Sequence, residues 1–259
     1  MSHISFSELK SWKICPFYHK LTYIDKINGF LGNEYTAFGS AIHRSCEKLL
    51  MEGDDGNSYG FFLNNFKKNI ESLLKKEVEV SQKTLDQMTS QGEKLLPLIL
   101  PGVERYFGNF TVVSTEERLL VPIDEPGVED CNFKGFVDLV IKTPDGKYHI
   151  IDWKSCSWGW DKMRRSEPMT TYQLVLYKYF FAKKHNIDPK KIETHFALLK
   201  RTAKKDNVEF FRVTSGSRKT QNSLNLLTKA IYNISNKRFI KNRLACDKCE
   251  FKNTKHCPR

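Results

Sequence analysis

Long hydrophobic runs are missing from this 259-residue sequence, and Gly and Pro are scarce, with 14 and 9 residues. The nearest apolar stretch, residues 95–103, contains two prolines and is far shorter than the ~20 residues of a membrane span. The low Gly and Pro content excludes collagen-like and Pro/Gly-rich disordered chains. The N-terminal residues lack the basic start and apolar block of a secretory signal. We therefore expect a folded, cytoplasmic protein with no membrane partner.

Acidic residues are also in deficit, because 42 Lys and Arg oppose 30 Asp and Glu and leave a formal charge of +12. Such an excess raises the encounter rate with polyanions, so DNA or RNA leads the list of partners. A generally basic, solvated surface is the alternative. The seven cysteines are an odd number in a chain without a secretion signal, which favours metal or cluster ligation over disulfides.

The pattern of apolar residues predicts a mixed α/β domain between helical ends, without internal repeats. Strands are expected where β-branched and aromatic residues concentrate, and helices where apolar residues recur at three and four positions. The predicted helices cover residues 5–27, 38–49, 59–80, 83–106, 168–179 and 224–234, and the predicted strands cover 111–123, 132–141, 147–153, 192–199 and 208–213.

Two aspartates are predicted to meet on neighbouring strands. Pro144-Asp145-Gly146 is a strong turn signal, and a three-residue loop there would place Thr143 opposite Lys147. Continued along the strands, this register puts Asp138 opposite Asp152. Like charges at directly opposed positions repel, and a bound Mg²⁺ or Mn²⁺ would keep both carboxylates ionised. The sequence therefore predicts a divalent metal site; the alternative is an ordinary salt bridge at each aspartate.

The same strand also carries Lys154 on the face of Asp152, because side chains two apart point the same way. Together with two further segments, the pattern resembles the RecB-like branch of the PD-(D/E)XK nuclease superfamily. That branch has a histidine helix, a Gly-x-x-Asp strand, an Asp/Glu-x-Lys strand and a Gln-x-x-x-Tyr helix in this order. The matching segments here are Phe38-Gly39-Ser40-Ala41-Ile42-His43, Gly135-Phe136-Val137-Asp138, Asp152-Trp153-Lys154 and Gln173-Leu174-Val175-Leu176-Tyr177.

The resemblance implies a restriction-endonuclease-like fold, in which a mixed central β-sheet is flanked by helices. It implies a single nuclease domain over 1–259, with the nuclease core in 34–216 and a helical, cysteine-bearing collar formed by 1–33 and 217–259. It also assigns roles to the motif residues. The metal ligands would be His43, Asp138, Asp152 and the Trp153 carbonyl, and Lys154 would position or polarise the attacking water.

Three further assignments have open alternatives. Glu117 is the better candidate for an additional family acid, with Glu116 as the alternative. Gln173 and Tyr177 lie four apart on one helical face and could orient the substrate or Lys154, whereas Tyr177 could equally be a core residue. His43, taken alone, could be an ordinary helix histidine.

The C-terminal tail holds Cys246, Cys249 and Cys257, and a fourth ligand is expected from Cys15. One cysteine before the nuclease motifs and three after them resembles the iron–sulfur members of this branch, including AddB-like and CRISPR-associated RecB-like enzymes. The resemblance implies a [4Fe-4S] cluster that pins the two chain ends together. The seven residues between Cys249 and Cys257 exceed the family interval, so Zn²⁺ is the alternative, and His256 could replace one thiolate.

Aromatic and basic residues alternate directly after Lys154, a composition suited to stacking on unpaired bases and pairing with phosphates. The candidate nucleic-acid contacts are Trp158, Trp160, Lys162, Arg164 and Arg165, and a loop with a packed tryptophan is the alternative.

Taken together, these features predict a metal-dependent deoxyribonuclease, a hydrolase that acts as an exonuclease on single-stranded DNA or DNA ends. The alternatives are a structure-specific endonuclease and a non-catalytic nucleic-acid-binding subunit of a repair, recombination or CRISPR-type complex. No P-loop motif is present, so any helicase activity would come from a protein partner.

Overall fold

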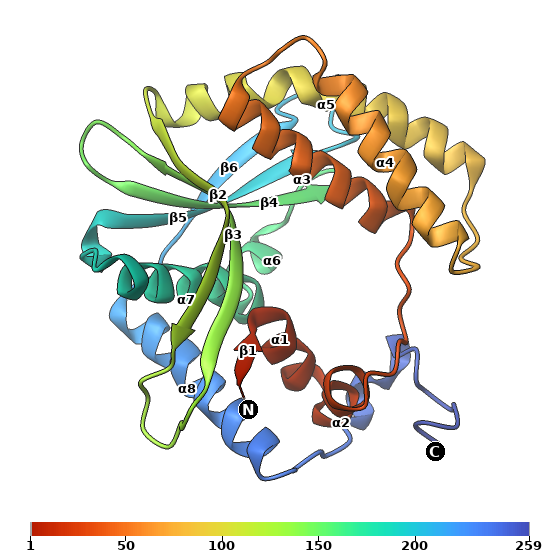
Figure 1. Cartoon of the computed structure of the whole chain (residues 1–259), viewed down its shortest axis with the longest axis vertical. Coiled ribbons are helices and arrows are strands. Elements are labelled where there is room, and N and C mark those ends of the chain that lie inside the picture. The colour runs from red at the N-terminus through yellow and green to blue at the C-terminus, as the bar shows by residue number, and fades with distance from the viewer. Residues whose placement is uncertain (1, 259) are drawn as a thin grey trace.

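A computed structural model of the chain, which describes residues 2–258, confirms the predicted mixed α/β fold with a central sheet flanked by helices (Figure 1). The strands are β1 (His3–Ser5), β2 (Thr111–Pro122), β3 (Asn132–Lys142), β4 (Tyr148–Cys156), β5 (Ile192–Lys200) and β6 (Val208–Val213). The α-helices are α1 (Phe6–Ile14), α2 (Pro16–His19), α3 (Glu34–Glu52), α4 (Ser58–Leu74), α5 (Gln82–Phe107), α6 (Lys162–Ser166), α7 (Pro168–His185) and α8 (Ser217–Ser235). Short π or 3₁₀ turns are η1 (Lys20–Ile24), η2 (Pro189–Lys191) and η3 (Arg243–Lys248).

The sheet forks at β3. Strand β2 pairs antiparallel with β3 along nearly its whole length, so β1 and β4 share the other edge of β3. The paired positions of β3 and β4 end at Leu139 and Ile151, and beyond them β4 pairs only with β5, in parallel. β1 pairs with the first residues of β3, from Asn132 to Lys134. Figure 1 shows β3 and β4 diverging, and the fork leaves room for side chains between them.

Two hydrophobic clusters lie on opposite faces of the sheet. α3, α4 and α5 cover one face, and α1, α7 and α8 cover the other (Figure 1). Strand β4 serves both, because Ile150 packs toward α7 while Ile151 and Trp153 pack toward α3 and α5. This alternation follows the two-residue period of a strand. It fixes which face of the sheet each polar residue of β4 reaches.

The region predicted to be helical, 5–27, is helical from Phe6 to Ile24, but it is broken at Cys15 between α1 and α2. Cys15 is extended, with φ −159° and ψ 113°, and precedes Pro16. A proline disfavours the helical conformation in the residue before it. The break brings Cys15 to the tail, where the N–H of Phe17 donates to the carbonyl of Ile240.

Helix α5 runs through Pro97 and Pro101, both of which face solvent. Its buried stripe, which includes Leu95, Ile99 and Val103, keeps the helical period and outweighs the two lost main-chain hydrogen bonds. No helix within residues 2–258 is both long and apolar enough to cross a bilayer.

Candidate nuclease site

The Gly-x-x-Asp and Asp-x-Lys segments meet where β3 and β4 separate. The predicted register is confirmed in the paired part of the hairpin, where Leu139 faces Ile151 and Thr143 N–H donates to the Lys147 carbonyl at 3.0 Å. Beyond this pair, a hydrogen bond to a side chain takes the place of the main-chain hydrogen bonds between the strands. The Trp153 N–H donates to Oδ2 of Asp138 at 2.8 Å. The side chain of Asp138 therefore lies between the two diverging strands and connects them by a hydrogen bond.

Helix α3 delivers His43 to the same carboxylate, with Nδ1 of His43 at 3.7 Å from Oδ2 of Asp138. Burial and the nearby Lys154 ammonium lower the pKa of His43 to about 4. The imidazole is therefore neutral at physiological pH and has a lone pair for a metal ion.

Asp152 is buried and held by α7. Its Oδ1 accepts a hydrogen bond from Nε2 of Gln173 at 2.7 Å, and its Oδ2 forms an ion pair with Lys154. Oδ2 is excluded from water, and the Lys154 ammonium is its partner. A cation bound at the site would replace or share this partner.

The two carboxylates oppose each other electrostatically. Burial and the negative charge of Asp152 raise the pKa of Asp138 well above its usual range, although Lys154 offsets part of this effect. Burial also raises the pKa of Asp152. One buried and one partly buried carboxyl group and a neutral imidazole form a donor set that suits a divalent cation, because the cation relieves both repulsion and desolvation. The residues therefore fit the metal that the nuclease motifs imply.

Glu116, and not Glu117, lies near the two aspartates. Glu117 points toward α7, where Lys184 at 2.8 Å and His185 at 2.5 Å bind its Oε1. Glu116 lies between two residues of β2 that pair with the neighbours of Asp138 in β3, and it has a left-handed φ of +45°. The assignment of Glu117 to the site is therefore corrected, since its carboxylate is occupied by side chains of another element.

The left-handed residue shifts the alternation of β2, so that Glu116 faces α3. There it lines a cleft of about 1050 Å³ together with His43 and Glu47. Burial, Glu47 and Asp152 raise the pKa of Glu116, which places its charge near the acidic pair. A left-handed non-glycine residue costs about 1–2 kcal/mol, and its position at a cleft is typical of a functional site. A Glu-Glu pair in a predicted strand gives no sign of this shift.

Tyr177 packs with its ring and forms a hydrogen bond with its hydroxyl group. Its ring lies over Gly135, where an added Cβ would come within 2.9 Å of the ring, and its hydroxyl accepts from Nε2 of Gln173 at 3.4 Å. The glycine of the Gly-x-x-Asp strand is thus required by the tyrosine of the Gln-x-x-x-Tyr helix.

The aromatic and basic residues of the segment 158–165 differ in their exposure to solvent. Trp160 is buried against Phe196, so its ring is not open to stacking on a base. Arg165 is part-exposed and binds Glu209 at 2.6 Å. Trp158 is 78% exposed. Lys162 and Arg164 are exposed as well.

A second cavity, of about 860 Å³, runs from Lys154 and Gln173 to the C-terminal tail. All four cysteines of the predicted cluster set line it: Cys15, Cys246, Cys249 and Cys257. Sγ of Cys15 accepts a hydrogen bond from the Asn242 N–H at 3.3 Å. Lys154 and Gln173 therefore share one open space with the thiols.

The fold of the chain is similar to that of a solved structure. A structure from Eubacterium rectale, provisionally described as an exonuclease, is 14% identical and has a TM-score of 0.61, and the match covers 98% of this chain and 89% of that chain. The structure of the protein SSO0001 aligns at 15% identity over 96% of this chain and 84% of its own, with a TM-score of 0.41. No curated protein matches. A family model described as the PD-(D/E)XK nuclease superfamily matches residues 3–257, so the chain belongs to that superfamily.

Proposed function

We propose that this chain is a metal-dependent DNA nuclease of the RecB-like branch that degrades single-stranded DNA or DNA ends as an exonuclease. The observation that carries the proposal is the pair of Asp138, bound by the Trp153 N–H, and the buried Asp152, bound by Gln173, beside the Lys154 ammonium. The two carboxylates place negative charge where a metal ion would bind, and the Lys154 ammonium places a positive charge beside them that can face the phosphate.

Each side chain has a distinct task in phosphodiester hydrolysis. His43, Asp138, Asp152, the Trp153 carbonyl and Glu116 would hold Mg²⁺ or Mn²⁺. When bound, such an ion neutralises the phosphate and lowers the pKa of a water molecule. Lys154 orients the attacking water, which forms a new P–O bond as the bond to the leaving oxygen breaks. Gln173 fixes Asp152 so that its second oxygen remains directed at the site.

The cavity from Lys154 to the tail provides the proposed path for a single strand. Lys10, Lys241, Arg243 and Lys252 line it and supply positive charge for phosphates. Trp158 offers an exposed ring for stacking at the loop that follows Lys154.

We further propose that Cys15, Cys246, Cys249 and Cys257 bind a [4Fe-4S] cluster. A single zinc ion holds thiolate sulfurs about 3.8 Å apart. Within residues 2–258, the only group of three possible metal ligands within 4.8 Å of one another lies elsewhere, at His149. Four thiols spread around one cavity suit the larger cluster better, and the Asn242 N–H already donates to Cys15 as peptide groups do to cluster sulfurs.

Circular and linear single-stranded DNA of one sequence, incubated with Mg²⁺ or Mn²⁺, test the cutting mode. An exonuclease degrades only the linear form, whereas cleavage of the circle supports the endonuclease alternative. Binding without loss of either form, in the parent as in Asp152→Asn, supports the non-catalytic alternative and overturns the proposal.

Iron and sulfide analysis after anaerobic purification tests the cluster. The parent should contain about four irons per chain. Cys15→Ser should lose them, and Cys156→Ser, which changes a thiol outside the proposed set, should retain them. One zinc and no iron would contradict the cluster.

A further inference from the structure

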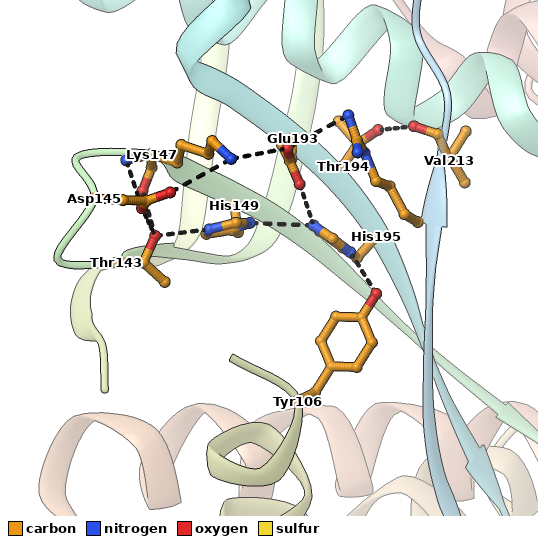
Figure 2. A network of polar contacts seen from close by, with 10 residues as sticks. Tyr106, Thr143, Asp145, Lys147, His149, Glu193, Thr194, His195 and Val213 are labelled. Carbon is orange, nitrogen blue, oxygen red and sulfur yellow. Dashed lines mark hydrogen bonds and ion pairs between the residues drawn. The ribbon is translucent and has the colours of Figure 1, made fainter. Parts of the chain in front are cut away.

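A second donor cluster lies near the start of β4, on the face of that strand opposite to Asp152. His149 on β4 and His195 on β5 direct their rings at each other, with Nδ1 of His149 3.2 Å from Nε2 of His195 (Figure 2). Glu193, two residues before His195 on the same strand, places Oε2 3.9 Å from that Nε2. Each of the three residues offers one ligand atom within 4.8 Å of the other two.

The spacing of these atoms matches a tetrahedral ion. Zinc binds imidazole nitrogen at 2.0–2.1 Å, so two nitrogens on one tetrahedral ion lie about 3.3 Å apart. The two histidines already have this separation. Oε2 of Glu193 has to approach Nε2 of His195 by about half an ångström, because zinc–oxygen bonds are of similar length. Glu193 retains 17% side-chain exposure and has room for this movement.

The outer nitrogens of both rings also have partners, as metal-binding histidines require. Nε2 of His149 lies 3.0 Å from Oγ1 of Thr143, and Nδ1 of His195 lies 3.4 Å from the Tyr106 hydroxyl. In metal sites the second ring nitrogen donates to such an oxygen, which fixes the tautomer and the ring orientation.

Glu193, the third ligand, has one carboxylate oxygen bound by basic side chains and the other directed at His195. Arg212 binds Oε1 of Glu193 at 3.4 Å. Lys147 binds the same oxygen at 3.6 Å, while Oε2 faces His195 (Figure 2). The cluster opens into a cavity of about 440 Å³, which provides space for a fourth ligand.

We propose that His149, His195 and Glu193 bind a divalent transition-metal ion of the zinc class, with a water in the fourth position. The site ties the start of β4 to β5 and, through Thr143 and Tyr106, to the β3–β4 turn and the end of α5. It is independent of the nuclease proposal, because the three ligands lie on the other face of the sheet from Asp152.

Zinc and cobalt binding to the full chain test this site, with Mg²⁺ as a control that imidazole ligands do not favour. The parent should bind one Zn²⁺ that persists in Asp152→Asn and in Cys246→Ser. Glu193→Gln should weaken that binding at least tenfold, whereas Glu209→Gln, which removes a carboxylate on the neighbouring strand β6, should not. The bound Co²⁺ should show no thiolate charge-transfer absorption.

His195→Gln should abolish binding, and its circular dichroism and thermal unfolding show whether the variant still folds. Glu193→Gln changes a partly exposed side chain and keeps the test valid if His195→Gln unfolds. Absence of the zinc equivalent from the parent, or its persistence in Glu193→Gln at unchanged affinity, would overturn the site and leave a hydrogen-bonded chain from Tyr106 to Asp145.

Discussion

The main-chain N–H of Trp153 donates its hydrogen bond to the side chain of Asp138, at the position where the β3–β4 ladder would otherwise continue. One carboxylate thus completes the backbone hydrogen bonding of the fork and also belongs to the nuclease centre. The two roles can be separated by substitution, because an amide retains the acceptor and loses the charge.

Asp138→Asn should be at least as stable as the metal-free parent at pH 8, since it removes the repulsion from Asp152 and keeps an acceptor for Trp153. Asp138→Ala should be less stable than Asp138→Asn by about 1–3 kcal/mol, the cost of an unpaired buried donor. Chemical denaturation in the presence of a chelator measures both. Equal stabilities of the two variants would show that the hydrogen bond contributes nothing.

Glu116→Gln should lower the nuclease rate about 10–100-fold, because it removes a charge beside the acidic pair. Glu117→Gln is the matched control on the next residue and should retain the parental rate, since its carboxylate is bound to Lys184 and His185. Rates on linear single-stranded DNA decide between them. The reverse ranking would restore Glu117 to the site.

Glu117 should instead affect stability, in a pH-dependent way. Burial raises its pKa, but hydrogen bonds from Lys184, Ser114 and His185 outweigh this effect, and the pKa is lowered overall. A carboxyl group with a lowered folded-state pKa stabilises the fold above its unfolded pKa of about 4.3, and the contribution disappears as the pH falls through the folded value.

Glu117→Gln should therefore cost about 1–2 kcal/mol at pH 7, after allowance for the partial exposure of Lys184 and His185. The difference from the parent should shrink below pH 4. Urea denaturation between pH 3 and pH 7 measures it. A difference that stays constant over this range would contradict the assigned ion pairs.

The two tryptophans of the loop after Lys154 should behave in opposite ways. Trp160→Ala should destabilise the fold by about 3–5 kcal/mol, because the ring is buried against Phe196. Trp158→Ala should leave stability unchanged and weaken single-stranded DNA binding by about 1–3 kcal/mol, the usual value for one stacked base. Fluorescence anisotropy and thermal unfolding distinguish the pair. Parental DNA affinity in Trp158→Ala would remove the stacking role.

Much of the sheet could be predicted from the sequence, because local patterns encode it. Pro144-Asp145-Gly146 fixed the hairpin loop, and the register that it implies is the one observed between Leu139 and Ile151. β6 has the predicted bounds, Val208–Val213, because its ends coincide with polar loops. These features depend on neighbours along the chain or across one tight turn.

Other features depend on partners that are distant in sequence. The choice between Glu116 and Glu117 depends on a left-handed residue that shifts the alternation of β2. The burial of Trp160 depends on Phe196, which a loop composition cannot reveal. The His149 and His195 cluster requires the parallel β4–β5 register, in which His149 faces Glu193.

Hydrolysis of linear single-stranded DNA by the purified chain, with and without divalent metal, tests the central claim most directly. The parent should release nucleotides in Mg²⁺ or Mn²⁺ and none in chelator, and Asp152→Asn and Lys154→Met should each reduce the rate at least 100-fold while remaining folded. Parental rates in either folded variant, or hydrolysis that persists in chelator, would contradict the claim that these residues and a divalent metal cleave the nucleic-acid backbone.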